Sequence, residues 1–408
     1  MGDPKRYKRV PNYKRIIIFV ILLALTVFTI FTLAKGFTKE NISNSNNSET
    51  NNESQSTIAP IKDTTINLVA IGDVMCHSTN FKGAYNATTK TYDFNPAFED
   101  IKKYTENADI TVGNLETTFA PDSVAYSGYP TFNSPKELGV ALKNIGVDVL
   151  STANNHSLDK GYTGLTSTID RLDEIGLDHM GTYQSAEEQE QILIKDVNGI
   201  RIAFLSYTYG TNGIPVPKGK EYCVNLIDKT LISKQIKQAK EQEVDLICVS
   251  MHWGDEYKLK QNSTQEQLAD FLFKEGADII LGSHPHVLEP MEKRTITLED
   301  GTTKDGFVIY SLGNFISGQV IANTKNTIIL NLKLTKHGDS GKITIDDYKY
   351  TPVYCYDKGA GTANRYKLID IRTAVEDYIA GKQNISSGLY STIKAELKKI
   401  EAIMEPSK

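Results

Sequence analysis

Short, largely apolar runs recur four times along the chain, each beginning directly after an Asp. Runs of this length between polar turn residues are typical of buried β-strands. A further run, Ile66–Ile71, precedes Gly72 and Asp73. The Asp residues are spaced by 39, 97 and 33 positions, which excludes a regular solenoid repeat. The runs are Ile110–Val112, Val149–Leu150, Leu246–Val249 and Ile279–Leu281, after Asp109, Asp148, Asp245 and Asp278.

Segments with helical periodicity lie between these runs. Ser134 to Glu137 and Ser263 to Glu266 have the pattern of capping boxes that open helices. Asn198-Gly199 predicts a two-residue hairpin turn. Later strands are expected over residues 306–316, 326–334 and 342–350. Strands that alternate with helices and end in late hairpins predict an α/β fold with mixed sheets.

The N-terminal part has the pattern of a membrane anchor. Ile16–Ala34 is 19 residues without a charge, and as a helix it would span roughly 28 Å, close to the ~30 Å of bilayer hydrocarbon. The alternative is a cleaved signal peptide, whose apolar core usually has about 7–15 residues. Basic residues before the run favour a cytoplasmic N-terminus. We therefore expect a single-pass protein of the cell membrane with an extracytoplasmic C-terminal domain.

The expected organisation follows from this anchor. The Asn/Ser-rich linker is of low complexity and cannot bury a core, whereas the tail is lysine-rich and is expected to be helical and peripheral. The expected segments are a cytoplasmic basic segment over 1–15, a transmembrane helix over 16–34, a linker over 35–60, the α/β domain over 61–360 and the tail over 361–408.

Charge is divided unevenly along the chain. Residues 1–40 carry 8 Lys and Arg against 2 Asp and Glu, which leaves 37 basic and 48 acidic residues from totals of 45 and 50. A domain with a net charge of −11 is not a general nucleic-acid binder. An anionic ligand would need a local cationic site, such as a bound metal ion.

Polar side chains of metal-ligand type follow each predicted strand. Open α/β sheets place their sites at the carboxyl ends of the strands, and the two imidazoles of His284-Pro-His286 point the same way if the strand continues through them. Carboxylate, amide and imidazole ligands without thiolate suit Mn, Fe or Zn, as one ion or as two with Glu116 between them. The candidate ligands are Asp73, Glu116, Asn155, His252, His284 and His286.

Two further residues are candidates for proton transfer. His156 follows Asn155 and is suited to donate a proton to a leaving group or to stabilise its charge, with Asp159 to orient it. Asp159 is also a common residue type at a helix start. Several of these residues have a structural explanation as an alternative. His252 could be a histidine of the core, and Trp253 could serve only for packing. Asp73 and Gly313-Asn314 could be turn residues. The four Cys have no CxxC spacing, and their pairing cannot be inferred.

Together these motifs resemble the CapA family of poly-γ-glutamate capsule biosynthesis proteins over about residues 65–320. The motifs are Gly72-Asp73-Val-Met, Gly113-Asn-Leu-Glu116, Asn154-Asn-His156-Ser-Leu-Asp159-Lys-Gly161, His252-Trp-Gly254, Gly282-Ser-His284-Pro-His286 and Tyr310-Ser-Leu-Gly-Asn-Phe315.

The resemblance implies more than the residues alone do. The family is similar to the calcineurin-like metallophosphoesterases, which implies a four-layer α/β/β/α sandwich with two mixed sheets. It also implies an anchored subunit that works with a polymer-synthesis ligase and membrane subunits, and an anionic polymer or a phosphoester as ligand. The chain departs from the metallophosphoesterase pattern at Met75, Asn114 and Ser157, where that pattern has His, Asp and an acidic residue.

Three functions are compatible with these features. The first is a component of capsule-polymer biosynthesis or export that acts by binding or assembly. The second is an active exported metal-dependent hydrolase that cleaves a phosphoester or the polymer. The third is a surface domain whose site is only structural.

Overall fold

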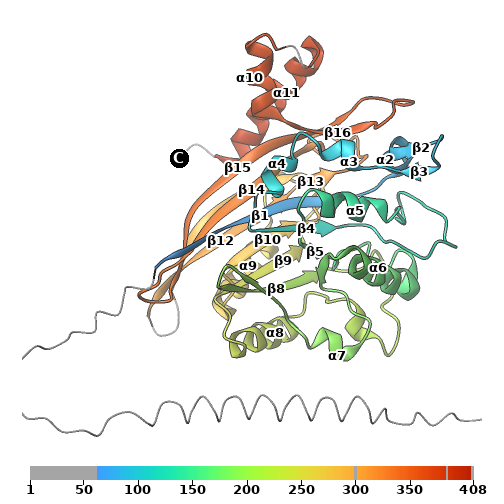
Figure 1. Cartoon of the computed structure of the whole chain (residues 1–408). Helices are drawn as coiled ribbons and strands as arrows, with labels where there is room; N and C mark the ends of the chain where they lie inside the picture. Colours follow the sequence, from blue (N-terminus) through green and yellow to red (C-terminus); the bar gives the residue numbers. More distant parts are fainter. Residues whose placement is uncertain (1–61, 298–300, 383–384, 406–408) are drawn as a thin grey trace, which may run out of the picture. The chain divides into compact units, whose positions relative to one another are not determined.

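The computed structural model describes residues 62–297, 301–382 and 385–405 (Figure 1). The expected basic segment, transmembrane helix and linker over 1–60 lie outside these residues. Among the helices of the described ranges, none combines the length and the hydropathy needed to cross a bilayer.

Two mixed sheets form the centre of the domain, as an α/β fold requires. The first has the order β16-β15-β14-β1-β4-β5-β6, with β13 beside β1, and its strands β1, β4, β5 and β6 run parallel. Its strands are β1 Thr64–Val74, β4 Ile110–Leu115, β5 Val149–Ser151, β6 Asp178–Met180, β13 Asn314–Ile316, β14 Asn326–Lys336, β15 Ile343–Asp357 and β16 Tyr366–Asp370.

The second sheet has the order β11-β12-β10-β9-β8-β7, and β8, β9, β10 and β12 run parallel. The predicted hairpin turn between β7 and β8 is confirmed, because Asn198 and Gly199 have φ values of 53° and 86°. The strands are β7 Leu193–Val197, β8 Ile200–Thr208, β9 Leu246–His252, β10 Ile279–Ser283, β11 Leu288–Thr297 and β12 Thr303–Leu312.

The helices begin near the predicted capping boxes but not on them. Helix α5 begins at Glu137 with no side-chain cap, and Ser134 hydrogen-bonds to Thr117 instead. The capping box of α9 is Asn262 with Gln265, one residue earlier than predicted. The remaining short elements are β2 Tyr85–Asn86, β3 Thr91–Tyr92 and the 3-10 turn Glu221–Cys223. The helices are α2 Ser78–Ala84, α3 Asn95–Phe98, α4 Lys102–Thr105, α5 Glu137–Asn144, α6 Gly161–Ile175, α7 Ala186–Gln189, α8 Lys229–Glu241, α9 Ser263–Glu275, α10 Ile371–Ile379 and α11 Ser387–Met404.

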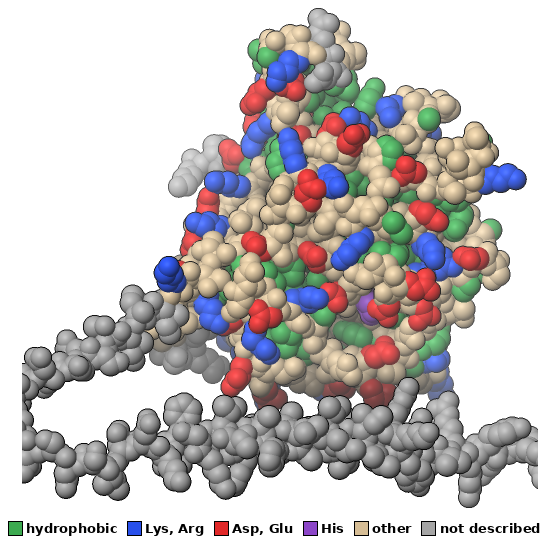
Figure 2. All heavy atoms as spheres, viewed as in Figure 1, with side chains coloured by type: hydrophobic (Ala, Val, Ile, Leu, Met, Phe, Trp, Pro, Cys, Tyr) green, Lys and Arg blue, Asp and Glu red, His purple; other side chains and the backbone are tan. Residues whose placement is uncertain are grey.

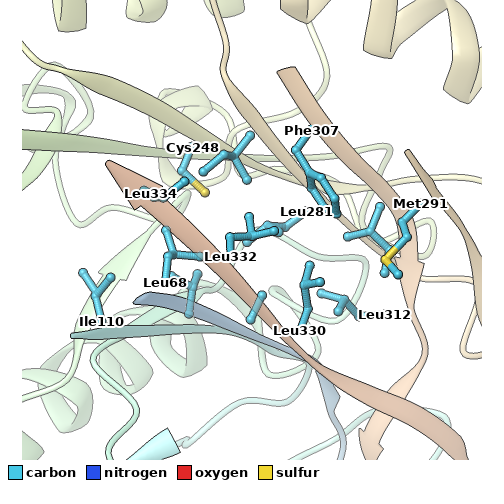
Figure 3. Packing of buried hydrophobic residues seen from close by; sticks show 14 of the residues in the cluster. Leu68, Ile110, Cys248, Leu281, Met291, Phe307, Leu312, Leu330, Leu332 and Leu334 are labelled. Carbon is cyan, nitrogen blue, oxygen red and sulfur yellow. The ribbon is translucent and has the colours of Figure 1, made fainter. Parts of the chain in front are cut away.

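The core lies between the two sheets and on their outer faces. In β1, Leu68 points into the apolar layer between the sheets, and Val69 points toward α5 on the other side. This alternation explains why the predicted strands are largely apolar and do not alternate with polar residues, since both faces are buried. Helices α8 and α9 cover the outer face of the second sheet. Figure 3 shows Leu68 and Leu332 of the first sheet close to Cys248 and Leu281 of the second.

The recurrent Asp residues clamp the starts of neighbouring parallel strands. In each case the carboxylate accepts a hydrogen bond from a backbone N–H of the adjacent strand, at the edge opposite the candidate ligands. The four bonds run from Asn67 to Asp109 (2.7 Å), Thr111 to Asp148 (2.9 Å), Arg201 to Asp245 (2.8 Å) and Ile247 to Asp278 (2.8 Å). The repeated Asp therefore stabilises the pairing of each strand with its neighbour.

The single strand expected over 306–316 is in fact two strands in different sheets. β12 belongs to the second sheet and β13 pairs with β1 of the first, and the chain changes sheets at Gly313, where φ is 66°. A side chain at Gly72 would lie 2.0 Å from the Gly313 carbonyl oxygen. The backbone at Gly313 therefore packs directly against Gly72 beside Asp73, and this contact requires glycine.

The C-terminal residues differ from the peripheral helical tail expected over 361–408. They begin with β16, which pairs with β15 at the edge of the first sheet. Helix α11 buries Ile393, Ile400 and Met404 in the same apolar cluster as the layer between the sheets. All four Cys are buried and free.

Replacing Gly282 by Ala is expected to destabilise the fold. The added Cβ would lie 1.9 Å from the Tyr310 carbonyl oxygen of β12, which is backbone and cannot move alone. Overpacking of this kind costs about 1–3 kcal/mol of unfolding free energy or more. Urea denaturation measures the loss. Gly388→Ala is the control, because its nearest neighbour would be 4.0 Å away, and an equal effect of both changes would contradict the steric argument.

Candidate metal centre

Side chains from both sheets meet where the parallel strands end. This is the shared edge that the strand pattern predicts, because parallel strands of one sheet end on the same side. All six predicted ligands lie there and are at most 4% exposed: Asp73 on β1, Glu116 after β4, Asn155 after β5, His252 at the end of β9, and His284 and His286 after β10.

The Glu116 carboxylate lies at the centre of this group. Its Oε1 atom is 3.7 Å from Nε2 of both His252 and His286, and no described donor hydrogen-bonds to it. Burial, followed by the charge of Asp73, raises the pKa of Glu116 well above its usual value. A buried acceptor without a donor is costly, and a bound cation would remove that cost.

Asn114 is a hydrogen-bond donor to two of the acidic candidates of the site. Its Nδ2 donates to Asp73 Oδ1 (2.9 Å) and more weakly to Glu116 Oε2 (3.4 Å). Each carboxylate keeps its other oxygen for the centre. Asn114 therefore holds the carboxylates of Asp73 and Glu116 side by side, although two negative charges at this distance repel each other.

His286 is held by an amide that fixes its ring. Its Nδ1 lies 3.1 Å from Asn314 Oδ1 and 3.3 Å from Asp73 Oδ2. Asn314 in turn donates its NH2 group to Gln319 and to the Thr324 carbonyl, so its oxygen faces the imidazole. With Nδ1–H donated, the Nε2 lone pair of His286 points toward Glu116. Histidines that ligate metals are commonly oriented in this way.

His252 faces Asn155 in a similar arrangement. His252 Nδ1 is 2.9 Å from Ser283 Oγ, and Nε2 is 2.9 Å from Asn155 Oδ1. Burial, followed by the positive charges of neighbouring histidines, lowers the pKa of His252 well below its usual value. The ring is therefore neutral, and its Nδ1–H is donated to Ser283. This leaves Nε2 as an acceptor that faces a second acceptor, Asn155 Oδ1. A cation bound between the two atoms would satisfy both.

His284 has an unusual backbone and a free ring nitrogen. Its φ is 97°, a conformation that is rare for a non-glycine residue and occurs mostly at functional sites. Its backbone N–H lies 3.3 Å from Asp73 Oδ2, and its buried Nδ1 has no hydrogen-bond partner in the described structure. Burial, followed by the charges of His286 and His156, lowers the pKa of His284 to about 3.

The side chains form two overlapping groups that suit cations. Glu116, His252 and His284 form one group, and Asp73, Glu116 and His286 form the other, with ligand atoms within 4.8 Å of one another in each. Both groups contain Glu116. The unpartnered Glu116 Oε1 and His284 Nδ1 atoms, together with an excess of acceptors over donors, fit a divalent metal ion.

His156 and Asp159 form a separate pair beside this centre. Asp159 Oδ2 lies 2.7 Å from His156 Nδ1 and also accepts from the Phe132 backbone N–H (2.6 Å). The Phe132 ring packs edge-on against His156, with 4.7 Å between the ring centres. Asn212 contacts the His156 ring at 3.4 Å and Asn155 at 3.1 Å, which links the pair to the metal-ligand group. Asp159 does not itself belong to either cation group.

Several residues of the site were not inferred from the sequence. Asn314 lies in the motif Tyr310–Phe315, but from the sequence Gly313-Asn314 predicts only a turn. His77 packs against Phe132, with 5.0 Å between the ring centres. Tyr209 packs on His284 with 4.5 Å between the ring centres, and Glu256 lies near His284 and His286. His77 and Glu256 each lie four residues after a predicted ligand, which is the one sequence signal that marks them.

A buried carboxyl beneath the site predicts a pH dependence of stability. Glu289 is fully buried, accepts from Gln265 Nε2 (2.6 Å) and has a pKa raised to about 8, mainly by burial. Because the folded pKa lies above the unfolded one, its stabilising contribution is complete below about pH 4.5 and is lost as pH rises through 8.

Glu289→Gln should therefore gain stability relative to the unmodified chain between pH 4.5 and 8, by on the order of 4 kcal/mol. Denaturation of both proteins in chelator at several pH values measures this difference. A difference that stays constant with pH would contradict the buried neutral carboxyl.

Residues 67–319 match the family model described as "Bacterial capsule synthesis protein PGA_cap". The chain is 30% identical over 291 residues to "Capsule biosynthesis protein CapA" of Bacillus anthracis, a match that covers 69% of this chain and 67% of that protein. It is 31% identical over 288 residues to "PGA biosynthesis protein CapA" of Bacillus subtilis (strain 168), covering 69% and 72%.

A solved structure is similar at a lower level. It is the calcineurin-like phosphoesterase YfkN from Bacillus subtilis, with a TM-score of 0.39 and 15% identity, over 71% of this chain and 90% of that one.

Proposed function

Because the chain belongs to the family of bacterial capsule synthesis proteins, we propose that it is a membrane-anchored, extracytoplasmic component of poly-γ-glutamate biosynthesis or export. Two relatives are named for capsule or PGA biosynthesis, and Ile16–Ala34 has the composition of an anchor. The proposed partners are a polymer-synthesis ligase and its membrane subunits.

The observation that carries the proposal is the convergence of five acidic and imidazole side chains on one buried point. The proposed site is metallophosphatase-like, on a four-layer sandwich, and holds one or two ions of Mn, Fe or Zn. Glu116 would lie between the two positions, because it belongs to both cation groups. When bound, such ions supply Lewis acidity and activate water.

The same site gives an acidic domain a place to bind an anion. Acidic and basic side chains are interspersed on the face shown in Figure 2, and the chain after residue 40 has an excess of acidic residues. Cations held by Asp73, Glu116 and the histidines would provide local positive charge for a carboxylate of the polymer or for a phosphoester. We propose one of these two groups as the ligand.

A second candidate function is an active exported metal-dependent hydrolase that cleaves a phosphoester or the polymer. The His156–Asp159 pair favours it, because a histidine oriented by a buried carboxylate is suited to protonate a leaving group. A protein that acts only by binding has no need of this pair.

Complementation tests the proposed function directly. A capsule-forming host that lacks its own family member is supplied with this chain, and the polymer is quantified. Restored polymer supports the biosynthetic role, and absence of polymer despite normal protein levels would contradict it. Release of phosphate or of polymer fragments by the purified protein would favour the hydrolase instead.

A further inference from the structure

A carboxylate outside the six predicted ligands lies at the mouth of the metal centre. Glu256 is exposed, and one of its oxygens lies within 4.8 Å of ring nitrogens of both His284 and His286, which themselves lie equally close together. The described residues thus form a third cation group, which is the only one of the three with an exposed member.

Two backbone hydrogen bonds join the loop that carries Glu256 to the segment that carries His284 and His286. The Trp253 N–H donates to the Ser283 carbonyl (3.1 Å), and the Tyr257 N–H donates to the carbonyl of Pro285 (2.8 Å), which lies between the two histidines. Glu256 therefore lies between two backbone anchors on the segment that carries His284 and His286.

The loop is also fixed on its other side. Gly254 has a φ of 90°, and a side chain there would lie 2.7 Å from the amide of Gln265. Asn262 donates to Asp255 Oδ2 (2.8 Å) at the start of α9. The position of Glu256 over the histidines is therefore determined by the fold, and not by a flexible side chain alone.

The space between Glu256 and the histidines contains acceptors. The buried His284 Nδ1 has no partner, and His286 donates Nδ1–H away from this space to Asn314. Burial, followed by the charge of the neighbouring Glu256 carboxylate, raises the pKa of the Tyr257 hydroxyl. A carboxylate oxygen and imidazole lone pairs that face one another form a ligand set for a divalent cation.

We propose that Glu256 is a further metal ligand, which coordinates from the solvent side an ion held by His284 and His286. This inference rests on the proposed metal site and extends it. It adds a carboxylate to a centre in which Asn114 offers an amide beside Asp73 and Glu116. As the exposed ligand, Glu256 occupies the side from which an anionic ligand would approach.

Metal titration of the full-length protein tests this assignment. The protein is purified in detergent, stripped with a chelator and titrated with Mn²⁺ in competition with a fluorescent chelator. Glu256→Gln is expected to weaken Mn²⁺ binding by about 10–100-fold, and Glu256→Asp, with its shorter side chain, by a smaller factor. Asp255→Asn is the matched control, because it removes an exposed charge one residue away that contacts Asn262 instead.

The outcomes separate this inference from the proposed function. Equal Mn²⁺ affinity of Glu256→Gln and the unmodified chain would overturn the Glu256 assignment and leave the metal site intact. Equal weakening by Asp255→Asn would show a general charge effect and would also overturn it. An unmodified chain that does not bind Mn²⁺ would refute the metal site itself. Anomalous diffraction from Mn²⁺-loaded crystals should place an ion within ~2.5 Å of a Glu256 oxygen.

Discussion

Replacing both His284 and His286 by Ala is expected to weaken divalent-metal binding by more than ~100-fold, since even the loss of a residue that only supports a ligand costs about 10–100-fold. Each of the three cation groups of the described residues contains at least one of these two imidazoles. Without them, one group keeps only Glu116 and His252 and another only Asp73 and Glu116, which leaves each with too few ligands to hold an ion tightly.

The same double variant is expected to abolish capsule-polymer production in the complemented host. Titration with Mn²⁺ and quantification of polymer measure the two effects. His337→Ala is the control, because that imidazole contacts Asp63 and Thr344 away from the site. Normal polymer yield from the double variant, at normal protein levels, would contradict every function that depends on this site.

Replacing His156 by Ala is expected to separate hydrolysis from metal binding. If the chain is a hydrolase, loss of a positioned general acid lowers kcat by about 10²–10⁴-fold. Metal affinity should change little, because His156 belongs to none of the three cation groups. Phosphate or fragment release and Mn²⁺ titration are measured on the same preparation.

Asp159→Asn provides the companion variant for His156. It keeps the shape of the side chain that accepts from Phe132 N–H and contacts His156 Nδ1, but it removes the charge that would stabilise a protonated ring. A smaller loss of kcat than in His156→Ala is expected. Hydrolysis that is unchanged in both variants would exclude the pair from catalysis and leave the binding role as the proposal.

The sequence predicted the strand ends, where the candidate ligands lie, better than it predicted the segments that connect the strands. Strand ends carry Asp73, His252 and His284 because parallel strands of one sheet end on the same side, and this follows from strand pattern alone. The Asp before each of the four runs predicted the start of a strand correctly. Its hydrogen bond to the neighbouring strand could not be predicted, because that bond depends on the order of the strands in the sheet.

Other features depend on contacts between distant segments. The change of sheets at Gly313 could not be inferred from the sequence, because it depends on which strands β12 and β13 pair with. The place of β16 in the first sheet could not be inferred for the same reason, since a strand of five residues directly before a helix has no distinctive sequence pattern. Glu256 becomes recognisable as a candidate ligand only when its loop is seen tied to Pro285.

Metal analysis of the unmodified chain tests the central claim most directly. The full-length protein, expressed with Mn, Fe and Zn available and purified without chelators, should carry one or two of these ions per chain. Anomalous scattering should place them between Glu116 and the rings of His252, His284 and His286. A chain that stays free of metal at millimolar Mn²⁺, or that binds ions only elsewhere, would contradict the account.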